Sequence, residues 1–355
     1  MKKIIALAVA SAFVAPAVMA EAVIYGSLRP HVEYSKITDN STNDLTKTRL
    51  VDDVSRIGFK GTDKLDNGLQ LFWQVENRIH IGAPNSTSGF NSRDSFVGVR
   101  GNFGEVSVGK ISDLTDDFVG ILPGLDYWNG ANASAYIFAT HGDTARLPNA
   151  ALYSSPVFFG GLQAKALYDF GKKTTTANYQ GYQGELTYST KLFKVGGVYK
   201  QNNDTANNGD SGTATLGAEN YYKSYILGAN ITPVDGFDIS VMWDRKKTRT
   251  AGVEARQDAW AVGASYLTGK HGIGVQYAKM GDIKNGSGTS SSDTGAYALV
   301  AQYKYSLSKQ TTAIAAIGRT RNDNNAAFSM HSDSLATIGN GAKITTISAG
   351  VRTDF

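Results

Sequence analysis

Short stretches in which apolar and polar residues alternate recur from one end of the chain to the other, and this period of two decides the fold class. In the first stretch, Ile24 and Val32 share one parity, whereas Arg29 and Glu33 share the other. Because successive side chains of a β-strand point to opposite faces of the sheet, the pattern predicts a strand with one apolar and one charged face. Pro30 cannot donate a ladder hydrogen bond, so we expect a bulge beside it.

The same alternation predicts sixteen strands, an even number. Five lie before residue 111, at 23–35, 51–62, 68–81, 93–101 and 105–110. Five follow a long irregular stretch, at 149–157, 161–171, 179–189, 193–201 and 221–231. The last six lie at 236–246, 257–268, 272–280, 295–306, 310–321 and 342–355.

The connections between these strands alternate in length. Short ones, such as 66–68, 102–104 and 269–270, contain residues that favour tight turns. Long polar ones, such as 201–220 and 322–340, come between them. Short turns at one end and long loops at the other are typical of a sheet that is threaded through a membrane.

The first twenty residues have the features of a secretory signal peptide. Lys2 and Lys3 precede an apolar run at 4–10, and small residues lead to Ala20. That run is too short to span a bilayer as a helix, so we expect residues 1–20 to be removed and residues 21–355 to form one domain. The rest of the chain contains no apolar run near eighteen residues, which argues against a transmembrane helix.

Two all-β folds fit this pattern, a closed transmembrane barrel with a wet lumen and a secreted β-sandwich or lectin. Tyr182, Tyr188, Tyr303 and Tyr305 lie near strand ends on the apolar parity, as in the aromatic girdles at membrane interfaces. A sandwich of this size would expose edges, whereas a closed barrel has none and satisfies its backbone groups in lipid. We therefore favour the barrel. A slip of one residue would point Arg29 at lipid, at a cost of about 2–4 kcal/mol at mid-membrane.

The irregular stretch at 111–146 has no steady period of two. Its apolar residues, Phe118 and Trp128 among them, distinguish it from a disordered segment, so we expect it to pack against another part of the protein. Between Ile111 and Ala145 it contains no Lys or Arg. Its charged residues are all acidic, namely Asp113, Asp116, Asp117, Asp126 and Asp143.

Composition excludes several classes of function. The chain has no cysteine, which excludes disulfides, thiol catalysis and thiolate metal sites. Without Lys2 and Lys3, the 35 basic residues become 33 against 31 acidic ones, a net charge of +2. This small surplus gives no indication of nucleic-acid binding.

Ser134, His141 and Asp143 are the residue types of a hydrolase triad and lie within ten positions. Triads are recognised by geometry rather than by proximity in sequence, so we do not assign catalysis to them. The five histidines lack the spacing of metal ligands, and the aspartates that begin the irregular stretch lack the glycine and distal glutamate of a calcium loop. We expect no metal and no cofactor.

Several motifs resemble the general trimeric porins of Gram-negative bacteria, in particular the neisserial and β-proteobacterial branch. The end of the chain, Ile347-Ser-Ala-Gly-Val-Arg-Thr-Asp-Phe355, resembles the last strand of outer-membrane barrels, whose terminal Phe is read by the assembly machinery. The other resembling segments are Ser-Arg-Ile-Gly-Phe-Lys-Gly at 55–61, Phe-Val-Gly-Val-Arg-Gly-Asn-Phe-Gly at 96–104, Val-Gly-Lys at 108–110, Tyr-Ser-Ser-Pro at 153–156 and Phe-Gly-Gly at 159–161.

The resemblance implies a 16-stranded antiparallel transmembrane β-barrel whose third external loop, at about 111–147, folds into the lumen and narrows it. It further implies a water-filled channel for the passive diffusion of small hydrophilic solutes and ions. The protein would lie among the lipids of the outer membrane as a homotrimer, with no enzymatic activity. The alternatives are an outer-membrane barrel enzyme, either a lipase or a protease, and a substrate-selective sugar channel.

In such porins, basic residues of the wall face acidic residues of the inserted loop. By position Arg56 matches a wall arginine, Lys110 stands where arginine is usual, and Leu152 stands where arginine is frequent. We expect Arg146 to substitute for the missing arginine. The predicted lumen residues are Arg56, Lys60, Arg78, Arg100, Lys110 and Arg146, facing Asp113, Asp116, Asp117 and Asp126.

Two points stay open at this level. Strict alternation from Val106 and Val108 would point Lys110 at lipid, so we expect the chain to leave the wall there. The basic and acidic residues oppose each other, so the sequence predicts charge filtering but leaves the preferred sign of ion undecided.

Overall fold

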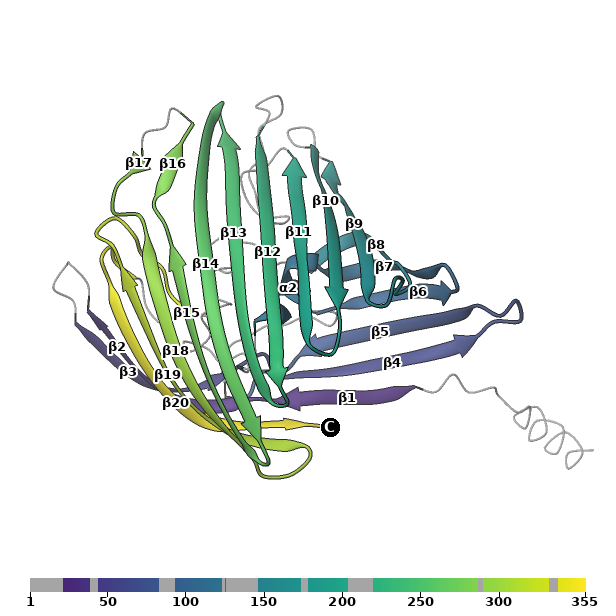
Figure 1. The fold of residues 1–355 in the computed structure, drawn as a ribbon, viewed down its shortest axis with the longest axis horizontal. Helices are drawn as coiled ribbons and strands as arrows, with labels where there is room; N and C mark the ends of the chain where they lie inside the picture. The colour runs from purple at the N-terminus through teal and green to yellow at the C-terminus, as the bar shows by residue number, and fades with distance from the viewer. Residues whose placement is uncertain are drawn as a thin grey trace, which may run out of the picture.

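The computed structural model describes residues 22–38, 44–82, 93–122, 125, 146–173, 178–203, 220–286, 290–331 and 338–355. Within these residues the chain forms one antiparallel sheet that closes on itself (Figure 1). The last strand, β20 (Lys343–Asp354), pairs with β19 (Thr311–Asn322) on one side. On its other side it pairs with β1 (Val23–Leu28) and β2 (Pro30–Thr38), which completes the ring.

The remaining strands follow one another around the ring in chain order. The first half contains β3 (Leu45–Asp52), β4 (Arg56–Lys64), β5 (Gln70–Arg78), β6 (Ser95–Gly101), β7 (Gly104–Ser112), β8 (Arg146–Ser154) and β9 (Leu162–Lys173). The second half contains β10 (Asn178–Ser189), β11 (Phe193–Asn203), β12 (Tyr221–Val234), β13 (Phe237–Thr250), β14 (Val253–Thr268), β15 (His271–Met280) and β18 (Ala296–Ser306). A hairpin of β16 (Ile283–Asn285) and β17 (Ser290–Ser291) flanks one end of β14.

The twenty labelled strands of the described residues make sixteen wall strands. β1 with β2, and β3 with β4, are each one interrupted strand, and the β16–β17 hairpin lies outside the wall because β15 pairs directly with β18. Each of the sixteen predicted stretches coincides with one wall strand. The sequence prediction of a 16-stranded antiparallel barrel is therefore confirmed.

The first two wall strands are interrupted at the same level. β1 ends directly before Arg29, next to Pro30, and β4 begins after a short break in which Val54 has a φ of 62°. Across the break, the Asp53 amide donates to the Arg29 carbonyl oxygen (3.1 Å), and the Arg29 amide donates to Ser55 Oγ (2.9 Å). The bulge expected at Pro30 is thus a break that both strands share. The second wall strand also begins at Leu45 rather than near 51, because β2 offers a paired edge along that length.

Lys110 lies within the wall, so the prediction that the chain leaves the wall there is wrong. β7 continues to Ser112, and Lys110 lies opposite Ser95 of β6. The register between β7 and β8 shifts between Gly109 and Ile111, and Gly109 has a φ of 143°, which favours glycine. From Gly109 to Ile111 of β7, the paired strand β8 runs from Ala150 to Leu147, so β8 has one extra residue there. The sequence pattern alone did not reveal this bulge.

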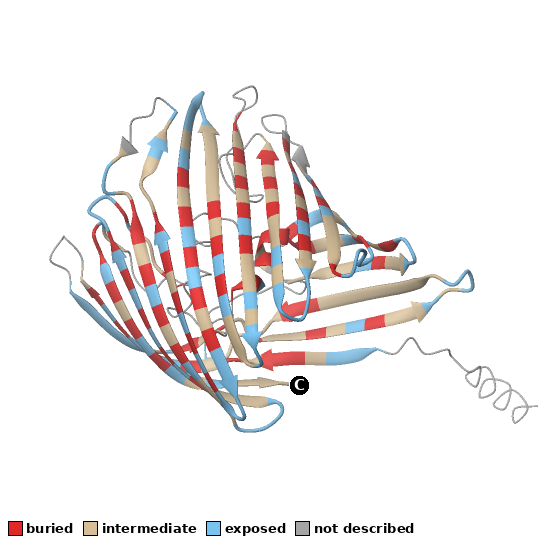
Figure 2. Ribbon diagram, in the orientation of Figure 1, coloured by how far each residue is buried: buried red, intermediate tan, exposed pale blue. Residues whose placement is uncertain are grey.

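The two faces of the ring differ in polarity. Large apolar side chains on alternate positions are exposed, for example Leu227, Val241, Ile273 and Ile347. The positions between them carry buried polar side chains, for example Ser224, Asp244, Gln276 and Thr346. Buried and exposed positions accordingly alternate along β12 to β15 (Figure 2). No helix among the described residues is long and apolar enough to cross a membrane.

Aromatic rings form two rows across the apolar face. Contacts between ring centroids 5.1–6.1 Å apart run from Tyr182 through Tyr199 to Tyr225, and from Trp260 through Tyr277 to Tyr297. A second row contains Tyr188 with Phe193, Phe237 with Tyr266, and His271 with Tyr303 and Tyr305. Six residues separate the two rows on β10, β14 and β18, which is about 20 Å along a strand. Two such rows bounding an apolar band are typical of a membrane-spanning barrel.

Candidate functional site

The segment that follows β7 lies against the face opposite the exposed apolar one. It begins with helix α2 (Leu114–Phe118) and the 3₁₀ turn η1 (Val119–Ile121). Leu114, Phe118 and Ile121 are each 1% exposed and belong to an apolar cluster that includes Ile226 of β12 and Met242 of β13. Figure 1 shows α2 beside β10 to β12, within the ring of strands.

A glycine of the wall allows this close approach. A Cβ atom added to Gly228 of β12 would lie 2.9 Å from Ile121 Cγ2 and 3.2 Å from Phe118. Both distances are shorter than ordinary carbon contacts, so any larger residue would displace the helix or the strand. Leu152, where the porin resemblance led us to consider an arginine, instead packs against the same apolar cluster.

A buried ion pair anchors the start of the segment. Lys200 Nζ on β11 lies 2.5 Å from Asp113 Oδ2, and both side chains are 0% exposed. The other carboxylate oxygen, Asp113 Oδ1, accepts hydrogen bonds from the Asp116 amide (3.0 Å) and from Thr115 Oγ1 (2.8 Å), so that Asp113 caps the N-terminus of α2. The Leu114 amide donates to Gln183 Oε1 on β10 (2.8 Å). Three strands of the wall and the helix are thereby held together.

A series of ion pairs joins arginine and acidic side chains of the wall to this segment. Arg56 Nε on β4 lies 3.4 Å from Glu76 Oε2 on β5, and Arg93 pairs with the other oxygen of Glu76. Arg146 Nε, at the start of β8, lies 3.0 Å from Asp94 Oδ1, and Arg146 Nη2 lies 3.7 Å from Asp116 Oδ2 on α2. We call these residues the arginine–acid cluster: Arg56, Glu76, Arg93, Asp94, Asp116 and Arg146.

Neighbouring polar groups fix the geometry of the arginine–acid cluster. The Tyr25 hydroxyl donates to Glu76 Oε2 (3.0 Å), and Ser112 Oγ donates to both oxygens of Asp94 at 2.9 Å. Arg93, which pairs with Glu76, and Asp94, which pairs with Arg146, are consecutive in the chain, so the two halves of the cluster are neighbours. Hydrogen-bonded carboxylates between arginines hold the guanidinium groups at fixed positions.

The structure brings some of the predicted lumen residues together and separates others. Arg56, Arg146 and Asp116 meet in the arginine–acid cluster, and Asp113 is buried beside it. Arg100 is elsewhere, since it contacts Gln70 and Glu105 beside the short turn that follows β6.

Three further predicted cations have other positions. Lys60 Nζ lies 5.0 Å from the centre of the Tyr25 ring, Arg78 lies opposite Arg56 in the β4–β5 register, and Lys110 lies opposite Ser95. The Asp117 side chain, Asp126 and the three triad-type residues Ser134, His141 and Asp143 lie outside the described part of the structure.

Sequence reasoning missed Lys200, Glu76, Arg93 and Asp94. Glu76 and Lys200 lie on the polar parity of their strands, which marks an interior position, but partners so distant in sequence leave no local signal. Arg93 and Asp94 lie just before β6, in a connection without periodicity. Within the described residues, no group of three His, Asp or Glu side chains could hold a metal ion.

A closed antiparallel sheet with an apolar outer face, two aromatic rows and a charged inner face defines a β-barrel of the kind that spans a bacterial outer membrane. Comparison with known families makes this specific. A model of the Gram-negative porin family matches residues 6–325, and the chain belongs to that family.

Known proteins agree with this assignment. Major outer membrane protein P.IB of Neisseria meningitidis is 32% identical over 57% of this chain, and the match spans 60% of that relative's length. The P.IB protein of Neisseria lactamica is 26% identical over 89% of this chain and 92% of its own length. The chain is thus a barrel of the Gram-negative outer membrane.

Solved structures share the fold at lower identity. An anion-selective porin from Comamonas acidovorans superposes with a TM-score of 0.74 and 22% identity, covering 95% of this chain and all of the other. The trimer form of OmpT from Vibrio cholerae superposes with a TM-score of 0.69 and 18% identity, covering 95% of this chain and 99% of the other.

Proposed function

We propose that this porin forms a water-filled channel through which small hydrophilic solutes and ions diffuse passively. The observation that carries the proposal is the arginine–acid cluster, which sets fixed charges of both signs on the inner side of a closed wall. A passage bounded by low-dielectric walls focuses the field of such charges on whatever passes through. The cluster contains no arrangement of nucleophile and base, so a diffusion channel suits it better than a barrel lipase or protease.

The segment 111–146 acts as the size filter in this proposal. Its start is fixed to the wall by the Asp113–Lys200 pair and by the packing of Phe118 and Ile121. A segment so anchored would hold the residues that follow it within the barrel. Arg146, at its far end, is tied by Asp94 and Asp116 to the same region, so both ends of the segment leave the wall close together.

Deletion of residues 120–139 tests the channel and the filter together. We expect the purified full-length protein to form open channels in a planar bilayer. The deletion should raise the single-channel conductance and admit larger sugars in a liposome-swelling assay. A wild-type protein without conductance would refute the channel. A deletion with unchanged conductance, in a barrel that still shows a heat-modifiable gel shift, would refute only the size filter.

We further propose that the functional unit is a homotrimer, and that the barrel assembly machinery of the outer membrane reads the terminal Phe355. The trimer form of a structural neighbour supports the first part. Mild crosslinking of membrane-extracted protein should give a band at three times the monomer mass. Migration as a monomer under these conditions would count against the trimer.

A further inference from the structure

Four cations face one another across neighbouring strands on the outer side of the barrel. Lys223 of β12 is paired in register with Lys247 of β13, Lys247 with Arg256 of β14, and Arg256 with Lys284 of β16. We call these four residues the cation row. They share the parity of exposed apolar residues such as Leu227, so their side chains point away from the interior.

The cation row is costly without a partner of opposite charge. Side chains directly opposite each other on neighbouring strands lie about 4.5–5.5 Å apart at Cβ, and like charges there are destabilising. Nearby acids are engaged elsewhere: Asp258 Oδ1 lies 2.6 Å from Arg245 Nε, and Glu254 accepts a hydrogen bond from the Tyr221 hydroxyl. Among the described residues, no ion pair joins a carboxylate to any member of the row. Lys223 and Lys247 lie over the rings of Tyr221 and Tyr225, so within the part of the chain that the structure describes the positive charge of the row has aromatic but no acidic neighbours in contact.

The cation row lies at the level of lipid headgroups. Lys223 is two positions beyond Tyr225, and Arg256 is four positions beyond Trp260, in each case towards the end with the long loops. Tyr225 and Trp260 belong to the aromatic row at that end, and such rows mark the membrane–water interface. Long loops are external in barrels of this type, so the row faces the external leaflet.

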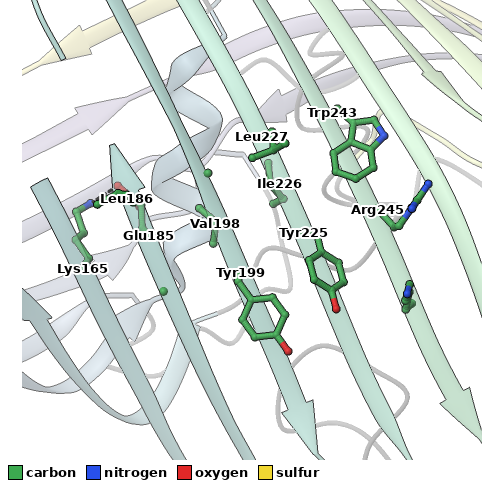
Figure 3. A pocket seen from close by; sticks show the side chains of 13 residues that line it. Lys165, Glu185, Leu186, Val198, Tyr199, Tyr225, Ile226, Leu227, Trp243 and Arg245 are labelled. Carbon is green, nitrogen blue, oxygen red and sulfur yellow. Dashed lines mark ion pairs between the residues drawn. The ribbon is translucent and has the colours of Figure 1, made fainter. Parts of the chain in front are cut away.

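An apolar groove adjoins the cation row on the membrane side. A cavity of about 720 Å³ has a lining that includes Leu186, Leu227, Trp243 and, at its edge, Lys247. Figure 3 shows Tyr199, Tyr225 and Trp243 on consecutive strands along this cavity. A Cβ atom added to Gly184, which also lines it, would meet nothing within 4 Å, so the glycine leaves open space. A smaller polar depression continues from Lys247 to Arg256 and Lys284.

We propose that this surface binds one phosphorylated membrane lipid, with its phosphate groups on the cation row and an acyl chain in the groove between Leu186 and Leu227. Charge complementarity selects the headgroup, since Lys and Arg clusters at a membrane surface attract anionic lipids. The groove would bind an acyl chain, which a free phosphate ion lacks. The proposal rests on the membrane location of the barrel and is independent of its conductance.

The test measures the binding of a defined lipid to the full-length protein by native mass spectrometry, whether the protein is purified as a trimer or as a monomer. Tetraoleoyl cardiolipin, which carries two phosphates, should bind with higher affinity than dioleoyl phosphatidylcholine, and millimolar inorganic phosphate should not displace it. The double variant Lys247→Gln/Arg256→Gln should lose about thirtyfold in cardiolipin affinity, given the usual contribution of each cation near a membrane surface. Gly184→Leu, which fills the groove without changing charge, should also weaken binding.

A matched control removes two outward cations from another part of the same rim. Arg319 and Arg321 are exposed on β19, near its long-loop end, and Arg319→Gln/Arg321→Gln should leave cardiolipin affinity unchanged. Equal losses of cardiolipin affinity in the two double variants would show general electrostatic attraction to the rim and would refute the proposed site. Displacement of cardiolipin by inorganic phosphate would mean an anion site without a lipid. A change in the mass of the oligomer without bound lipid would show that a second copy of the chain covers the groove, and would refute the lipid site. A heat-modifiable gel shift verifies that each variant is folded.

Discussion

Asp113 and Lys200 are 87 positions apart in sequence, yet their side chains form an ion pair in which neither is exposed to solvent. Removal of one partner leaves an uncompensated buried charge, which costs about 3–5 kcal/mol in known cases, whereas replacement of both by apolar residues is often neutral. The pair therefore fixes where the segment after β7 attaches to the wall.

We predict that Lys200→Met lowers the unfolding temperature of the barrel and increases current noise, because the start of α2 loses its anchor. The double variant Asp113→Leu/Lys200→Met should recover part of the stability, because it removes the unpaired buried charge but also the cap of α2. Gel-shift midpoints on heating measure the first effect and bilayer recordings the second. Arg245→Met, which removes the Arg245–Asp258 pair, in which each side chain is 33% exposed, is the control and should change both quantities less. If Lys200→Met matched this control, the buried pair would have no anchoring role.

A second prediction concerns the contact between Gly228 and η1. A leucine there would overlap Ile121 and Phe118, so Gly228→Leu should cost about 1–3 kcal/mol or displace the helix. Under the proposed function, displacement would change single-channel conductance. Gly184→Leu adds the same side chain to an open outward position and should leave conductance as it is. Identical conductance in wild type and Gly228→Leu would show that the position of the helix does not affect ion flow.

Gly26 and Phe355 meet where the barrel closes. Each donates its backbone amide to the other's carbonyl oxygen, at 2.8 and 3.1 Å. A Cβ atom at Gly26 would lie 2.3 Å from the Phe355 ring and 2.7 Å from the Arg56 carbonyl oxygen. We predict that Gly26→Val reduces the yield of heat-modifiable barrel, with Gly184→Val as the tolerated counterpart. Normal yield and thermal midpoint for Gly26→Val would contradict this role for the glycine.

The sequence predicted the wall well because alternation, turn residues and aromatic placement are local signals. The strand containing Trp243 and the one containing Trp260 follow directly from a period of two. The same reasoning failed at Lys110, because β7 continues to Ser112 with a register shift against β8 that leaves no mark in the composition. It also missed that Pro30 and Val54 interrupt two neighbouring strands together, since that depends on pairing between strands.

The candidate site was less predictable than the wall. Arg56, Arg146 and Asp116 could be chosen by charge and by resemblance, and the structure places them in one cluster. The acids that hold these arginines, Glu76 and Asp94, come from strands and connections whose proximity is a consequence of the closed register. Charge alone also selected Arg100, which the fold places with Glu105 beside a short turn.

The last prediction concerns the sign of ion selectivity, which depends on the balance within the arginine–acid cluster. Arg56 is only partly neutralised, because Glu76 is shared with Arg93. Asp116 lies 3.7 Å from Arg146, which pairs more closely with Asp94 at 3.0 Å. An opposed pair at about 4 Å interacts with about 4 kcal/mol at an effective dielectric of 20, so charges at the passage outweigh those on the exterior.

Arg56→Ala should therefore move the zero-current potential in a salt gradient towards cation preference, and Asp116→Ala should move it towards anion preference. Both shifts should be larger at low salt, since charges are screened over about 10 Å at 0.1 M. Arg100→Ala, which lies outside the cluster, is the matched control and should produce a smaller shift than Arg56→Ala. Shifts of the same sign in Arg56→Ala and Asp116→Ala would refute the opposed-charge filter, because a passage governed by both groups must respond oppositely to the loss of each.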